Sequence, residues 1–358
     1  MNLGPLVIGE YKFEKKIVQA GMGVGITLGR MAIASSKAGV VPVVALIGTN
    51  YYPDKNIPIG KHFASRESIF QLINDIRLEV GQAPVFCNIM YALTDFEDIV
   101  KDAIEAGYNG IICGAGFQDI LPELIEKHSK PWQKIAIVPI VNHRAFPLLM
   151  RTWKKRNGRM IIPDAVIIEG PKSGGHQGYK KEEIDDPNFQ LEVTAPKVLE
   201  QVRKISNIPL IVAGGIMYRE DVKYFENIGC YVQIGTRFLM THESDASDFH
   251  KQAVIDCKEE DITIGDSPAG YPCRKIETQL QKNMKAGTAP KVVCKADCLT
   301  NCNHGEVARK LGYCIADELG RAHQGNPNGL YIVGARGHEI NEIISVEELV
   351  KELSTDSK

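Results

Sequence analysis

Eight short apolar runs alternate with helix-length segments along this chain, and no other feature constrains its fold as strongly. The runs are apolar nearly throughout, as parallel strands covered on both faces are. Amphipathic segments such as 66–80, 95–107 and 194–205 separate them as predicted helices. This βα spacing predicts an α/β fold, a closed (β/α)8 TIM barrel. The predicted strands are 16–22, 40–48, 84–91, 110–116, 134–141, 164–170, 209–216 and 231–238.

An open, doubly wound sheet is the competing arrangement. Its dinucleotide fingerprint needs a third glycine shortly after the run GMGVG (21–25), and Ile26 stands at that position. The second predicted strand also ends in ALIGTN (45–50), without the acidic residue that binds a ribose. Both observations favour the closed barrel.

The βα pattern stops after the eighth predicted strand. Residues 242–328 have the pattern of helical or irregular chain with no clear strand, and they carry a cysteine cluster. An apolar run then returns, and Ser345 followed by Glu348 has the spacing of a helix capping box. We therefore predict a barrel at 1–241, a helical, cysteine-rich subdomain inserted over the barrel mouth at 242–328, and a return to the barrel at 329–358.

Composition excludes several classes of partner. The 42 basic and 44 acidic residues leave a formal charge of −2, and no basic stripe points to nucleic acid. The N-terminus lacks the apolar core of a signal peptide, and no 18-residue apolar segment occurs. We expect a soluble, cytoplasmic protein that acts on a small-molecule substrate and has no nucleic-acid or membrane partner.

The seventh and eighth predicted strands end in glycine-rich loops, AGGI (213–216) and GTRF (235–238). In barrels the functional groups lie at the C-terminal strand ends, and the loops after strands seven and eight often bind phosphate. Glycines there expose backbone N–H groups to the anion, and Thr236 could add a hydroxyl. We predict a phosphate site, the alternative being that the glycines only permit tight turns.

Amide and glycine-rich residues occupy the remaining strand ends. Gln19 and Asn88 offer the paired donors and acceptors that suit the edge of a flat heterocycle, unless they only hydrogen-bond within loops. The backbone of GMGVG (21–25) could lie against a ring face, because glycine has no side chain. A phosphate and a flat ring together predict flavin mononucleotide (FMN) as the cofactor.

Five motifs occur in the order found in one enzyme family: IVQAGMGVGI, EGPKSGGHQGY, PLIVAGGI, IGTRFLMTHES and SPAGYPCRKI. Through them nearly the whole chain resembles the nitronate monooxygenase (2-nitropropane dioxygenase) family, whose relatives include the FMN-dependent enoyl-ACP reductases. The resemblance implies an FMN-binding barrel with a helical domain over the cofactor. It also implies that His176 is the catalytic residue beside the flavin, and homodimers are common in the family.

The strand ends and the matched motifs together give the predicted cofactor site. Its residues are Gln19, Gly21, Met22, Gly23, Asn88, Glu169, Gly174, Gly175, Gly214, Gly215, Gly235 and Thr236.

Three functions are compatible with these motifs and the predicted cofactor site. In the first, an FMN-dependent monooxygenase oxidises alkyl nitronates to carbonyl compounds and nitrite, with His176 as base or hydrogen-bond donor. In the second, an enoyl-ACP reductase uses NAD(P)H as a further cofactor. In the third, the barrel anchors a sugar phosphate for isomerase or aldolase chemistry. The sequence shows no feature of a nicotinamide site, which favours the first.

Four cysteines lie close together near the end of the predicted subdomain. Their spacing is C-x3-C-x3-C-x11-C, which would place the first three on one face of a helix. Four thiolates in a short span could hold zinc or an iron–sulfur cluster, although the spacing matches no common motif, and reduced packing thiols are the alternative. The candidate ligands are Cys294, Cys298, Cys302 and Cys314.

Overall fold

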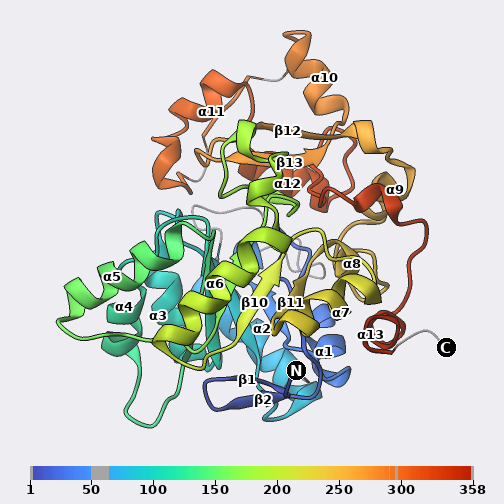
Figure 1. Cartoon of the computed structure of the whole chain (residues 1–358). Coiled ribbons are helices and arrows are strands. Elements are labelled where there is room, and N and C mark those ends of the chain that lie inside the picture. Colours follow the sequence, from blue (N-terminus) through green and yellow to red (C-terminus); the bar gives the residue numbers. More distant parts are fainter. Residues whose placement is uncertain (1–2, 50–63, 290, 295–296, 356–358) are drawn as a thin grey trace.

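The computed structural model describes residues 3–49, 64–289, 291–294 and 297–355. A barrel of eight parallel strands forms its centre (Figure 1), in the order β3-β11-β10-β8-β7-β6-β5-β4. A parallel bridge between Val18 and Val41 joins the two ends of this sheet. Each predicted strand contains an observed one, so the TIM barrel is confirmed. The strands are β3 (Ile17–Gln19), β4 (Val43–Ala45), β5 (Phe86–Met90), β6 (Gly110–Gly114), β7 (Ala136–Val141), β8 (Val166–Glu169), β10 (Leu210–Ala213) and β11 (Tyr231–Ile234).

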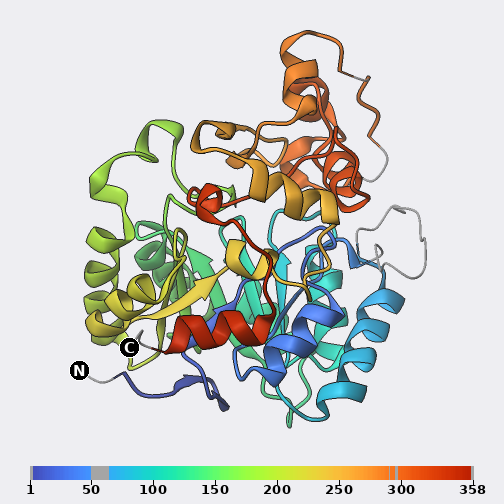
Figure 2. The same cartoon turned by 90° about the vertical axis from the view of Figure 1, so that its right-hand side faces the viewer.

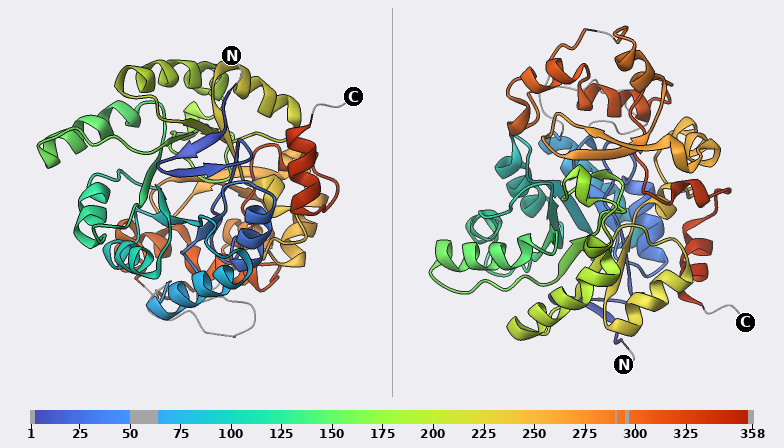
Figure 3. Two further views of the ribbon diagram at one scale, coloured as in Figure 1. Left: turned by 90° about the horizontal axis from the view of Figure 1, so that it is seen from below. Right: turned by 45° about the horizontal axis from the view of Figure 1, so that its top comes forward.

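Helices surround the strands (Figure 3), and each buries one apolar stripe against the sheet. In α3, for example, Phe96, Ile99, Val100 and Ala103 are buried, at the spacing of a 3.6-residue repeat. The three helices predicted at 66–80, 95–107 and 194–205 are confirmed as α2, α3 and α6. The barrel helices are α1 (Gly29–Lys37), α2 (Arg66–Val80), α3 (Phe96–Ala106), α4 (Leu121–His128), α5 (Ala145–Asn157), α6 (Leu191–Ile205), α7 (Arg219–Ile228) and α8 (Thr236–Leu239).

An antiparallel hairpin covers the N-terminal end of the barrel. Its strands are β1 (Leu6–Ile8) and β2 (Tyr11–Phe13), and Figure 3 shows it across the barrel seen from below. Leu6, Ile8 and Phe13 are buried in one cluster with the inward-facing side chains of the strands. This end is thereby closed, and the opposite end carries the site.

Residues 242–328, which we call the insert, lie over the C-terminal end of the barrel (Figures 1 and 2). The expectation of no strand in this segment is wrong, because β12 and β13 form an antiparallel pair that continues onto β9 in the barrel loop. The β12 sequence ITIGD is only partly buried, and β13 buries Arg274 and Lys275, so neither is an apolar run. The helices and strands of the insert are α9 (Asp248–Asp256), β12 (Ile262–Asp266), β13 (Pro272–Ile276), α10 (Gln279–Lys285), α11 (Glu306–Leu311) and α12 (Ile315–His323). Strand β9 (Gly175–His176) belongs to the barrel.

The C-terminal segment (residues 329–340) passes back between insert and barrel, and α13 (Val346–Ser354) then packs beside α1, as Figure 2 shows. The predicted capping box is present: Ser345 Oγ accepts from the Glu348 N–H at 3.1 Å, and the Glu348 carboxylate accepts from the Ser345 N–H at 2.8 Å. Among the described residues, no helix is both long and apolar enough to cross a membrane. The cellular location and the domain boundaries stay predictions.

Candidate active site

Two connected cavities lie between the strand ends and the insert. The first has a volume of about 220 Å³ and lies among the ends of β3, β8, β10 and β11 and the C-terminal segment. The second has a volume of about 390 Å³ and lies among the ends of β5, β6 and β7 and the insert. Residues that line both are Gly21, Gly23, Ile140, Glu169, Gly174 and Ile332.

The structure brings most of the predicted site residues into these walls. Asn88 and His176 line the second cavity. Gln19 is not among the lining residues: its Oε1 accepts from the Val43 N–H at 3.0 Å and its Nε2 donates to the Ala20 carbonyl, so it ties β3 to its neighbours. The first cavity is lined by Gly21, Met22, Gly23, Glu169, Gly174, Gly175, Gly214, Gly215, Gly235 and Thr236.

The loop after β10 packs against the loop that follows β8 (residues 170–179), which we call the histidine loop. The two loops are so close that residues with side chains would not fit between them. Gly214 and Gly215 have φ values of 110° and 77°. A Cβ on Gly214 would lie 2.9 Å from the Ser173 nitrogen, and one on Gly215 would lie 2.8 Å from the Lys172 Cβ. Both glycines also line the first cavity. Backbone without side chains suits a phosphate there, because a phosphate binds backbone N–H groups.

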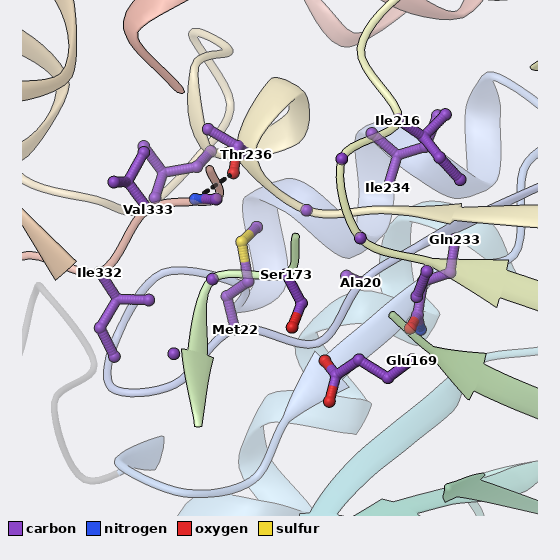
Figure 4. A pocket seen from close by; sticks show the side chains of 18 of the residues that line it. Ala20, Met22, Glu169, Ser173, Ile216, Gln233, Ile234, Thr236, Ile332 and Val333 are labelled. Atoms are coloured by element: carbon purple, nitrogen blue, oxygen red, sulfur yellow. Dashed lines mark hydrogen bonds between the residues drawn. The ribbon is translucent and has the colours of Figure 1, made fainter. Parts of the chain in front are cut away.

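The C-terminal segment completes this wall. The Gly334 N–H donates to Thr236 Oγ1 at 3.0 Å, the dashed contact in Figure 4. The Arg336 guanidinium donates to the Gly215 carbonyl at 3.0 Å and to Asp221 at 2.8 Å. The sequence predicted that this segment returns to the barrel, but not that it forms part of the site. A glycine inside its apolar run was the available signal.

Gln233 is a second residue that the sequence reasoning missed. It lies in β11, is 5% exposed, and lines the first cavity (Figure 4). A polar side chain inside an otherwise apolar buried strand was the available signal, because buried amides require partners.

Residues of the insert hold His176 in place. Strand β9 pairs with β13, with His176 opposite Cys273, and the Gln177 N–H donates to the Pro272 carbonyl at 2.7 Å. His176 Nε2 lies 2.8 Å from Ser267 Oγ. The histidine is therefore fixed by backbone pairing and by a side-chain hydrogen bond.

Arg274 of β13 also holds the histidine loop, through hydrogen bonds to its backbone. Its buried guanidinium donates to the carbonyls of Pro171 at 2.5 Å and Ser173 at 2.9 Å. Two charge-assisted hydrogen bonds to one short loop restrict its conformation.

Two titratable groups of the site are shifted in opposite senses. Burial lowers the pKa of His176 to about 4, so the imidazole is neutral at neutral pH. Burial raises the pKa of Glu169 to about 7, against a smaller opposing effect of its hydrogen bond with Ser173. Paired groups with divergent pKa values are typical of acid–base sites.

The residues of the first cavity fit FMN. Gly214, Gly215 and Gly235 present backbone where a phosphate needs N–H donors, and Gln233 and Glu169 add polar groups suited to a ring edge. Apolar side chains complete the wall, as in most cofactor sites. They are Met22, Ile216, Leu239, Ile332 and Val333.

The cysteine cluster does not have the predicted form. Cys302 ends a short 3-10 turn and Cys294 lies in irregular chain, so these cysteines do not lie on the one helix that would align them. Burial first, and then the neighbouring Cys314, Cys302 and Cys294, raise the pKa of Cys298 to about 12. Within the described ranges, no group of three or more His, Cys, Asp or Glu side chains is arranged to hold a metal ion.

A bound metal or iron–sulfur cluster at these cysteines stays a prediction. Iron with acid-labile sulfide, or zinc, in near-stoichiometric amounts in the purified protein would support it. A protein that contains neither would leave the four thiols as packing groups.

A barrel that joins glycine backbone at a phosphate-sized cavity to a half-buried histidine fits the class of flavin-dependent oxidoreductases, and the family match assigns the chain to that class. The chain belongs to the nitronate monooxygenase family, whose model matches residues 6–356. Over 286 residues, 75% of this chain and 78% of the relative, it is 25% identical to a probable nitronate monooxygenase of Bacillus subtilis (strain 168). A probable nitronate monooxygenase of Staphylococcus saprophyticus is 34% identical over 124 residues, 34% of each chain.

Solved structures share the fold. FabK from Thermotoga maritima is 22% identical with a TM-score of 0.69, over 95% of this chain and 92% of that one. A nitroalkane oxidase from Streptomyces ansochromogenes is 19% identical with a TM-score of 0.65, over 96% of this chain and 95% of that one. At this level of identity the likeness concerns the architecture alone.

Proposed function

We propose that this protein is an FMN-dependent nitronate monooxygenase, which oxidises alkyl nitronates to carbonyl compounds and nitrite. The observation that carries the proposal is the junction of the two cavities: one is lined by glycine backbone and polar groups that suit FMN, and His176 lines the other. The family membership and the names of its curated relatives also support it.

In this proposal FMN is held by the glycine loops after β10 and β11, with Gln233 and Glu169 at its polar edge. When bound there, FMN supplies the electron acceptor for oxidation of the substrate. The substrate then occupies the second cavity, where Ile47, Met90 and Phe117 suit an alkyl group.

His176 handles the proton of the substrate. Because Nε2 is engaged with Ser267, we assign this role to Nδ1. When the Ser267 hydroxyl donates to Nε2, Nδ1 carries a hydrogen and can bind an anionic nitronate. In the other tautomer Nδ1 is free to accept the α-proton of a neutral nitroalkane.

His176→Ala tests this role. We expect the variant to retain FMN and to lose turnover about a thousandfold, within the range that general acid–base groups contribute. The measurements are flavin absorbance and initial rates with propyl-2-nitronate. Near-normal rates would show that the imidazole has no catalytic part.

An enoyl-thioester reductase is the second candidate, since the apolar second cavity also suits an acyl chain. An aerobic nitronate assay and anaerobic mixing with NAD(P)H together separate the two functions. Turnover of ethyl nitronate with oxygen but without NAD(P)H supports the monooxygenase. Rapid bleaching of the flavin by NAD(P)H, without nitronate turnover, supports the reductase. A colourless protein that binds no FMN would contradict both.

A further inference from the structure

Glu169 occupies the junction of the two cavities. It ends β8, directly after the buried residues Val166, Ile167 and Ile168, and lines both cavities. In the described part of the chain it is the one carboxyl group in either wall. Figure 4 shows this carboxyl group extending into the first cavity, beneath Ser173 and Gln233.

Three neighbours of this carboxyl group on the loop after β8, namely Ser173, His176 and Tyr179, are uncharged near pH 7. The Ser173 hydroxyl lowers the pKa of this carboxyl group, but by less than burial raises it. His176 is neutral near pH 7, because burial lowers its pKa to about 4. Tyr179 keeps its phenolic proton, since burial and then Glu169 itself raise the pKa of the tyrosine.

The cations of the first cavity do not neutralise Glu169. Arg336 is committed to Asp221 at 2.8 Å and to Glu339 at 2.6 Å. Lys172 lines the same wall, but no ion pair joins it to Glu169 in the described ranges. Glu169 is half-buried in the apoprotein, and once a cofactor covers it an ionised carboxylate would lack the opposite charge that buried carboxylates require.

We infer that Glu169 carries a proton in the FMN complex, so that it presents a carboxylic acid to the cofactor and couples FMN binding to pH. This inference rests on the FMN site proposed above. A bound cofactor displaces water from the carboxyl group and disfavours its charged form. The carboxylic acid can donate one hydrogen bond, which a carboxylate cannot.

The direction of the pH dependence follows from the raised pKa. In the apoprotein the pKa of Glu169 is about 7, and FMN raises it further. FMN affinity is therefore greatest below pH 7 and falls as the pH rises, because the proton lost by the apoprotein must be taken up again. The FMN phosphate has its own ionisation near pH 6, but this contribution is common to every variant.

Fluorescence titration of the apoprotein with FMN tests the coupling, with Glu169→Gln as the isosteric variant that cannot ionise. Between about pH 6 and about pH 8.5 we expect the Kd of the parent protein to rise roughly tenfold more than the Kd of Glu169→Gln. Glu182→Gln, which changes an exposed carboxyl group of the same region, should follow the parent. Equal pH dependence in the parent and Glu169→Gln would overturn the inference.

A measurement on the parent protein alone covers the case in which Glu169→Gln does not fold. Calorimetry near pH 8, in buffers of different ionisation enthalpy, should show uptake of about one proton per FMN bound. FMN binding without proton uptake would overturn the inference and leave the proposed function standing. Failure of the parent to bind FMN at any pH would overturn the proposed function itself.

Discussion

The two halves of the barrel mouth are built in different ways. The half around β10 and β11 is formed by glycine backbone, and Gly214 and Gly215 allow it to approach the histidine loop closely. The half around His176 depends on side chains and a strand that arrive from the insert, about a hundred residues further along the chain.

This difference separates binding from chemistry. A backbone cradle tolerates little change in shape but needs no particular side chains, which suits an invariant phosphate group. A histidine must be oriented, and orientation requires hydrogen-bond partners at fixed distances. We therefore expect changes in the first half to act on FMN affinity, and changes in the second half to act on turnover.

Gly214→Ala should have the largest effect of the substitutions that test this separation. The new Cβ would lie 2.9 Å from the Ser173 nitrogen at a φ of 110°, so the loop must move or remain strained. Backbone strain of about 1–3 kcal/mol predicts a rise in the FMN Kd of up to about a hundredfold. Fluorescence titration of the apoprotein measures it, and turnover per bound FMN should change little.

Gly158→Ala is the matched control for this substitution. Gly158 also has a positive φ, 64°, but no described atom beyond its own chain neighbours lies within 4 Å of the new Cβ. A normal FMN affinity in Gly158→Ala, beside a weakened one in Gly214→Ala, assigns the effect to the cradle. Equal affinity in both variants would contradict the role of Gly214.

Arg274→Met tests the other half. The methionine fills much of the space of the arginine stem but leaves the Pro171 carbonyl without its side-chain donor, while the Ser173 carbonyl keeps only the donor Gln177 Nε2. Loss of hydrogen bonds from a buried charged group predicts a fall of about 2–3 kcal/mol in the free energy of unfolding. We expect kcat to fall more than tenfold, because His176 loses its fixed loop, while FMN remains bound.

Thermal unfolding and steady-state kinetics measure these two effects. The control is Arg159→Met, which removes an exposed guanidinium whose side chain is 63% accessible and pairs with Glu126 on the surface. It should leave both quantities nearly unchanged. Lost FMN with normal turnover per flavin in Arg274→Met would reverse the assignment of the two halves.

The same contrast explains what the sequence could predict. Parallel strands and glycine turns are local patterns, so the eight strands and the site residues Gly214, Gly215 and Thr236 are predictable from the sequence alone. Strand β13 could not be recognised, because its Arg274 and Lys275 are buried through long-range pairing that no local pattern shows. The contribution of the C-terminal segment was missed for the same reason.

Ser267→Ala gives the smallest and most specific effect on the histidine half. It removes the hydroxyl group 2.8 Å from His176 Nε2 and leaves the backbone pairing of β9 with β13 intact. The loss of one neutral hydrogen bond, about 1 kcal/mol, predicts a fall of about fivefold in kcat with unchanged FMN affinity. Ser267→Thr, which keeps the hydroxyl, should recover most of the lost rate.

The pH profile shows whether this effect comes from positioning or from titration. Because burial lowers the pKa of His176 to about 4, the neutral imidazole is present well above that pH and is lost only as the pH falls through it. The ratio of the parent rate to the Ser267→Ala rate should therefore stay constant from about pH 5.5 to about pH 8. A ratio that changes within this range would mean that His176 titrates there. Ser267 would then set the charge of the imidazole rather than its orientation.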